Sequence, residues 1–139
     1  MITDIKLSSY IERYGEKWAD DLPDNCPPED VCVCSGELFY RYTINRDYIV
    51  PEDWNNYLKL YPGKTFSDNQ RIFAAGLSLL HDKETAVNKT KLPGVRNQFN
   101  GIAAIPLEPE DGVVLQSYKQ HHYTWWRTIM CNLSKAQII

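Results

Sequence analysis

Hydrophobic and polar residues alternate along several short stretches of this chain, and these stretches predict β-strands. In LFYRYTI (38–44) the side chains of Leu38, Tyr40, Tyr42 and Ile44 share one face, as the two-residue period of a strand requires. The other predicted strands are residues 77–80, NGIAAIPL (100–107), GVVLQ (112–116) and HYTWWRTIM (122–130).

Other stretches carry hydrophobic residues at the three- and four-residue spacing of helices. Residues 5–18 have this spacing and follow Thr3, a residue type that caps helices. In VPEDWNNYLKLYP (50–62) a proline stands where a helix would begin, and Trp, Tyr and Leu side chains line one side. Ser67 and Asp82 are predicted to cap two further short helices.

The order of these elements predicts an α+β fold, because several short helices and four or five strands follow one another without strict alternation. The chain has 139 residues, which fits one domain with a substantial core. We expect a single domain over 1–139 with a mixed or mainly antiparallel sheet of four to six short strands. Within it we expect an acidic N-terminal helix over 1–24, a core over 26–126 and a tail over 127–139.

Composition narrows the class of protein. Hydrophobic residues make up 43% of the chain and charged residues 24%, which is ordinary for a globular protein. The net charge of −3 argues against a general nucleic-acid coat protein, so we expect no DNA partner. No stretch resembles a signal peptide or reaches the length of a membrane span, which favours a cytoplasmic protein without a membrane partner.

The cysteines do not form a recognisable metal site. Cys26, Cys32 and Cys34 have C-x5-C-x-C spacing, whereas structural zinc is held by pairs of cysteines two to four residues apart. Cys131 stands alone. We therefore expect four reduced thiols and no metal, with the first three in an ordered loop, CPPEDVCVCSG (26–36), where Pro27 and Pro28 exclude a helix.

HHYTWW (121–126) is the densest cluster of chemically capable side chains. In a strand, neighbouring residues face opposite sides, so at most half of the cluster can serve one pocket. One histidine facing a cleft could act as an acid, a base or a ligand contact, whereas a core histidine bonded to the backbone is the structural alternative. The two faces are His121, Tyr123 and Trp125, and His122, Thr124 and Trp126.

Two groups of basic residues are candidates for anion binding. Arg41 lies between Tyr40 and Tyr42 on the predicted strand, where a guanidinium can hold a phosphate or carboxylate, or can pair with an acid at the sheet surface. The segment 88–100 contains three bases and no acid, and it could contact phosphates or form a solvated loop. The candidate ligand-binding residues are Arg41, Tyr40, His122, Trp126, Lys89, Lys91 and Arg96.

Five segments taken together resemble a family of short hypothetical bacterial proteins. That family has a Cys-Pro-Pro start, a Tyr-Arg strand, a Gly-Leu-Ser element and a His-x-Thr-Trp-Trp-like end. The resemblance covers residues 26–126, and it implies a bacterial, single-domain protein but no activity. The matching segments are CPPEDV (26–31), FYRYT (39–43), PEDW (51–54), AAGLSLL (74–80) and HHYTWW (121–126).

The order of elements is also similar to that of small ADP-ribosyltransferase-like domains. It consists of a strand with Arg, a Gly before a strand with Ser, a helix, and late strands. In such domains a residue of the first strand contacts the NAD pyrophosphate or ribose, a second-strand Ser or Tyr helps, and a late acid acts on the ribose. The resemblance implies these roles for Arg41 and Ser78, whereas Glu108 and Glu110, the late acids, stand in a turn-like segment without that context.

The absence of recognisable catalytic motifs favours a non-catalytic binding or accessory domain without a cofactor. Its expected partner is another protein, with a homo-oligomer as an alternative, because the chain is rich in Tyr and Trp. A second hypothesis is an NAD-handling enzyme or a degenerate relative, with the catalytic candidates Arg41, Ser78, His121 and His122. A third, weaker hypothesis is binding of RNA or a phosphate ligand.

Overall fold

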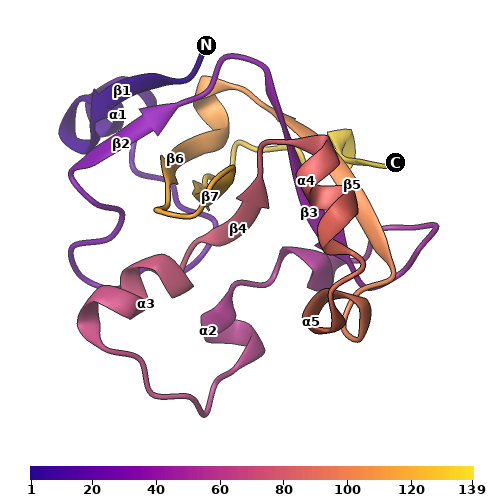
Figure 1. The fold of residues 1–139 in the computed structure, drawn as a ribbon. Coiled ribbons are helices and arrows are strands. Elements are labelled where there is room, and N and C mark those ends of the chain that lie inside the picture. Colours follow the sequence, from indigo (N-terminus) through magenta and orange to yellow (C-terminus); the bar gives the residue numbers. More distant parts are fainter.

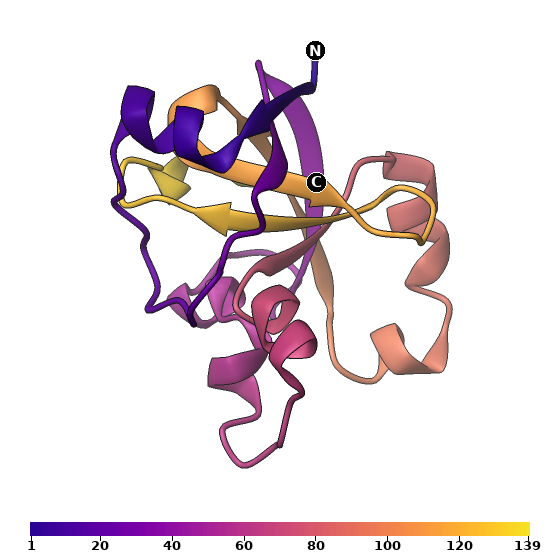
Figure 2. The ribbon, with the colours of Figure 1, turned by 90° about the vertical axis from the view of Figure 1, so that its left-hand side faces the viewer.

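An eight-stranded antiparallel sheet curls into a half-barrel and forms the framework of the protein (Figures 1 and 2). The computed structural model describes all residues, 1–139. The strand order is β1-β2-β6-β7-β4-β3-β5-β8, and every neighbouring pair is antiparallel. The strands are β1 (Thr3–Lys6), β2 (Asp30–Val33), β3 (Glu37–Thr43), β4 (Leu77–Leu80), β5 (Gly101–Leu107), β6 (Gly112–Gln116), β7 (His122–Arg127) and β8 (Gln137–Ile138).

The predicted α+β fold with a sheet of four to six strands is therefore wrong. Strands β3 to β7 overlap the five predicted strands, although β7 ends at Arg127 and not at residue 130, but β1, β2 and β8 were not predicted. These three strands are two to four residues long, and β1 and β8 are the edges of the sheet. Their hydrogen bonds come from distant segments, so their own residues carry little strand signal.

Five short α-helices surround the sheet, with α1 on one side, α4 and α5 on the other, and α2 and α3 together at one end (Figure 2). None of them has the length and apolar character needed to cross a membrane. The helices are α1 (Leu7–Tyr14), α2 (Tyr57–Leu60), α3 (Asp68–Ala74), α4 (Lys83–Lys89) and α5 (Pro93–Arg96), and the 3-10 helices are η1 (Pro51–Trp54), η2 (Pro109–Asp111) and η3 (Leu133–Lys135).

Two of the three predicted helix starts have the expected capping residue. The side chains of Ser67 and Asp82 accept hydrogen bonds from the amides of the third residue of α3 and α4, which confirms both predicted caps. The helix predicted over 5–18 is wrong at both ends, because its first residues form β1. It stops at Gly15, whose φ of 85° favours glycine and breaks the helical conformation.

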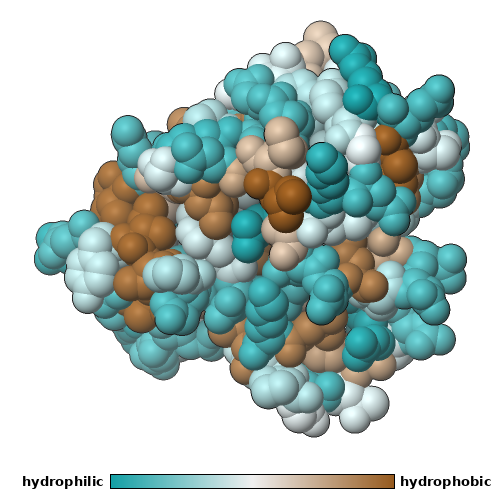
Figure 3. All heavy atoms as spheres, turned by 180° about the vertical axis from the view of Figure 1, so that it is seen from behind, coloured by the Kyte–Doolittle hydropathy of each residue, from teal (hydrophilic) through white to brown (hydrophobic).

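The hydrophobic core lies on both faces of β7. Trp125 packs with Phe39, Leu79 and Ile105 on one face, and Trp126 packs with Tyr10 and other residues under α1 on the opposite face. Both indoles are almost fully buried, and they lie on the opposite faces that the alternation in HHYTWW predicts. On the outer surface seen from behind, hydrophobic residues form separate groups among hydrophilic ones (Figure 3).

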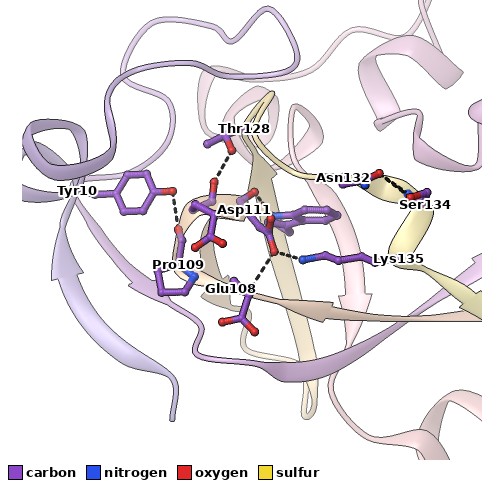
Figure 4. Close-up of polar contacts among 10 residues, drawn as sticks. Tyr10, Glu108, Pro109, Asp111, Thr128, Asn132, Ser134 and Lys135 are labelled. Atoms are coloured by element: carbon purple, nitrogen blue, oxygen red, sulfur yellow. Dashed lines mark hydrogen bonds and ion pairs between the residues drawn. The ribbon is translucent and has the colours of Figure 1, made fainter.

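The turn between β5 and β6 joins the two ends of the chain to the sheet (Figure 4). Within η2, the Asp111 carboxylate accepts the amide N–H of Glu108 at 2.7 Å and pairs with the ammonium of Lys135. The Tyr10 hydroxyl donates to the carbonyl of Pro109, and Thr128 donates to that of Glu110. The residues expected to form a tail, 127–139, are thus part of this network and of the sheet through β8.

Substitution of Asp111 by Asn should lower the free energy of unfolding by about 2 kcal/mol, because it leaves a partly buried ammonium without its counter-ion. Asp30→Asn is the matched control, since it breaks the exposed ion pair with Lys6 and should cost less than about 0.5 kcal/mol. Urea unfolding of both variants tests this prediction, and equal effects would contradict it.

Candidate functional site

A cleft opens where strands β3 and β4 separate. The two strands pair only at Tyr40 and Leu80, and beyond this point they diverge toward α2 and α5 (Figure 1). The cleft has a volume of about 430 Å³ and is lined by residues from both strands, from η1, α2, α4 and α5, and from the loop between β6 and β7. It is within the size range of small-molecule sites.

Arg41 bridges the diverging strands with its guanidinium. Nε donates to the carbonyl of Asp53 at 2.7 Å, one terminal nitrogen donates to that of Ser78 at 2.9 Å, and the other donates to that of Asn55 at 2.9 Å. The side chain thereby ties β4, η1 and the residue after η1 to β3. Because a guanidinium has five N–H donors, two remain without a partner in the protein.

No acid forms an ion pair with Arg41, although the negative charge of the nearby Asp53 favours its charged form. Arg41 takes part in none of the four ion pairs of the protein. The carboxylate of the neighbouring Asp53 instead accepts the backbone amides of Ile44 and Val50, both at 2.8 Å. Burial lowers the pKa of Arg41 to about 10, which still leaves it charged at neutral pH. A largely buried cation without a carboxylate partner on a cleft wall is suited to an anionic ligand.

His122 and Ser78 line the same cleft as Arg41. The Nδ1 atom of His122 lies 2.8 Å from the hydroxyl of Ser117, which leaves Nε2 free for a ligand. Burial, and then the charges of Lys119 and Lys89, lower the pKa of His122. Arg41 contacts the backbone carbonyl of Ser78, and no hydrogen bond joins the side chains of Arg41, Ser78 and His122 to one another.

Two of the other candidate residues line the cleft, and the rest lie elsewhere on the surface or in the core. Tyr40 and Lys89 line the cleft, whereas Lys91 and Arg96 are exposed outside it. Trp126 is buried and donates its indole N–H to the carbonyl of Ile72. His121 stands in the turn before β7 with a φ of 63° and is not part of the cleft.

The acids named by the ADP-ribosyltransferase resemblance lie elsewhere. Glu108 and Glu110 belong to the η2 turn, beside the Asp111 network, and do not line the cleft (Figure 4). The acids that do line it are Glu52, which is exposed, and Asp53, whose carboxylate caps the turn before η1.

Several cleft residues were not predicted as site residues. Tyr57 and Tyr61 from the α2 region stack on each other with ring centroids 6.0 Å apart, and Tyr42 stacks on Phe99 at 5.8 Å. The spacing in 50–62 does place both α2 tyrosines on one side, so an exposed aromatic pair was a signal for this wall. Nothing in the sequence around Lys119 marks it, because only the hairpin brings it to the cleft.

The four cysteines are free thiols: Cys34 and Cys131 lie in the core cluster of Trp125, Cys32 packs against that cluster, and Cys26 packs against the cluster of Trp126. Burial raises the pKa of Cys26 and of Cys32 to about 11, so both are protonated at neutral pH. No group of three or more His, Cys, Asp or Glu side chains is arranged to hold a metal ion.

Comparison of the chain with protein-family models, with curated proteins and with solved structures found no match.

Replacing Arg41 by Lys should lower the free energy of unfolding by about 3 kcal/mol. A single ammonium cannot reach all three carbonyls, and each buried carbonyl left without a donor costs about 1–3 kcal/mol. The matched control is Arg46→Lys at an exposed position, with an expected change below about 0.5 kcal/mol. Urea denaturation measures both; an equally small effect at Arg41 would contradict the bridging role.

The lowered pKa of His122 predicts a pH dependence of stability. Above pH 6.5 the imidazole is neutral in both folded and unfolded chains, so its burial carries no protonation penalty. As the pH falls below 6.5, the unfolded chain takes up the proton first, and stability is lost until the pH passes the folded pKa. Urea unfolding at pH 7.5 and 5.5 should show a smaller loss for His122→Gln than for the original chain, and NMR titration should place His122 below 6.5.

Proposed function

We propose that this protein is a non-catalytic binding domain whose ligand site is the cleft between β3 and β4. The ligand is a small molecule that brings an anionic group to Arg41. The observation that carries this proposal is the Arg41 guanidinium, which is fixed by three carbonyls, largely buried and without an acid partner. Because the guanidinium is already held in one orientation, binding of an anion requires little further loss of side-chain entropy.

The walls of the cleft specify the remainder of the ligand. Aromatic rings from β3, from α2 with the residue that follows it, and from the segment after α5 line it, and Tyr57, Leu60 and Tyr61 are each more than two-fifths exposed. Flat or apolar ligand surface packs well on such rings. The cleft therefore favours a ligand in which a flat ring carries the anion.

An NAD-handling site is the second candidate function, and it is favoured by one observation. Arg41, Ser78 and His122, which lie far apart in the sequence, line a single cleft. In this alternative the pyrophosphate lies near Arg41, and Glu52 is the cleft acid with an uncommitted carboxylate. RNA binding, a protein partner, a homo-oligomer and a cytoplasmic location remain predictions.

Binding of phenylacetate and of its neutral analogue phenylacetamide tests the main proposal, because the two share a ring and differ in charge. Phenylacetate should bind at least about tenfold more tightly, the effect of one charge-assisted contact. In NMR spectra it should shift the Arg41 Nε–H signal and amides of the cleft. Equal affinity, or shifts confined to other surfaces, would overturn the proposal.

Two variants sharpen this experiment. Arg41→Lys should weaken phenylacetate binding, whereas Glu52→Gln should strengthen it slightly by removing a like charge from the same cleft. Calorimetry with NAD and ADP-ribose distinguishes the NAD-handling enzyme from the non-catalytic domain. The enzyme is favoured if Arg41→Lys abolishes binding of these ligands and if the protein slowly cleaves NAD, with the cleavage lost in Glu52→Gln.

A further inference from the structure

A second group of cations lies at the other end of the same cleft. Lys89 comes from the last turn of α4, Lys119 from the loop between β6 and β7, and His122 from the start of β7. Neither lysine takes part in an ion pair. Three positively charged or chargeable groups from separate elements thus converge on one wall without an acid.

Electrostatics shows that these groups are close enough to act on one another. Both lysines depress the pKa of His122 after burial, and they are the charged groups that act on its ring. The other polar neighbour of His122 is the Ser117 hydroxyl, which also accepts the amide N–H of Lys119. This repulsion is relieved when a dianion binds between the groups, because each cation then gains an opposite charge.

The two ends of the cleft are separated by roughly two strand spacings. His122, Leu80 and Tyr40 are neighbours across β7, β4 and β3, and two strand spacings place the backbones of β7 and β3 about 10 Å apart. The side chain of Arg41 leaves β3 on the other face from Tyr40, and its guanidinium lies between β3 and β4, where it donates to the carbonyl of Ser78. The stacked pair Tyr42 and Phe99 also lines this cleft. An aromatic ring with a substituent at each end has a length that matches this separation.

The two ends differ in the anion that suits them. Arg41 has two N–H donors left, which match the two oxygens of a carboxylate. Two ammonium groups and an imidazole can together balance the charge of close to −2 on a phosphate monoester and donate to its three oxygens.

We propose that Lys89, Lys119 and His122 form a phosphate subsite, and that the ligand is an aromatic carboxylate that also carries a phosphate monoester. This inference rests on the proposed function, since it assigns the carboxylate to Arg41. It adds that the natural ligand is a phosphorylated small molecule, held at both ends of the cleft with its ring against the aromatic wall.

Three probes test the subsite: phenylacetate, phenyl phosphate, and 4-(carboxymethyl)phenyl phosphate, which carries both groups on one ring. Calorimetry should give at least about tenfold tighter binding for the double probe than for either single one. In the Lys89→Gln/Lys119→Gln variant this advantage should fall to within about threefold, while phenylacetate binding should weaken by no more than about twofold. Both lysines can be replaced with little risk to folding, because their ammonium groups make no hydrogen bond or ion pair in the protein.

The dependence on pH supplies a readout specific to His122. A phosphate next to the imidazole favours the protonated ring, so the double probe should bind more tightly at pH 6.5 than at pH 8, while phenylacetate should not. His122→Gln should remove this difference. His121→Gln, a change at the adjacent turn residue outside the cleft, should retain it.

The outcomes separate the two proposals. The phosphate subsite is overturned if the double probe binds no more tightly than phenylacetate, or if its tighter binding survives the lysine substitutions. If phenylacetate binding still depends on Arg41 in either case, the proposed function stays intact. Failure of all three probes to bind at millimolar concentration overturns both.

Discussion

The three hydrogen bonds from Arg41 to backbone carbonyls are the interaction on which both the fold and the site depend. Where β3 leaves β4, the carbonyl of Ser78 loses its place in the strand ladder, and those of Asp53 and Asn55 approach from the segment around η1. One guanidinium satisfies all three. A continuous ladder would have closed this part of the sheet, so the cleft exists because a side chain replaces the strand pairing there.

The contacts that stabilise the sheet around Arg41 also leave its positive charge available to a ligand. The carboxylate that could have neutralised Arg41, that of Asp53, is held by two backbone amides of the turn before η1. The positive charge therefore stays on the cleft wall, and the three carbonyls fix its orientation without removing it. The same contacts that hold the sheet together keep the guanidinium in place for a ligand, which is why neither Lys nor a neutral side chain can substitute for it.

The sequence carried the information for the central strands and part of the site, but not for the assembly. Alternation in LFYRYTI gives β3 and places Arg41 opposite Tyr40 and Tyr42, and this alone makes it a candidate for anion binding. The edge strands β1 and β8 were missed because their pairing depends on residues 24 or more positions away. Lys119 was missed for a related reason: its role depends on a hairpin that brings a polar loop beside the end of α4.

The adjacent histidines show how burial elsewhere determines which side chain serves a site. Trp126 must be buried against the residues under α1, and the period of a strand then directs His122, four residues earlier, to the same face of β7. The register with Leu80 carries that face to the cleft. His121 is excluded by a different cause, since it occupies the left-handed turn that begins the strand. Two tryptophans that do not themselves line the cleft therefore select the histidine that does, and the site depends on the core for its geometry.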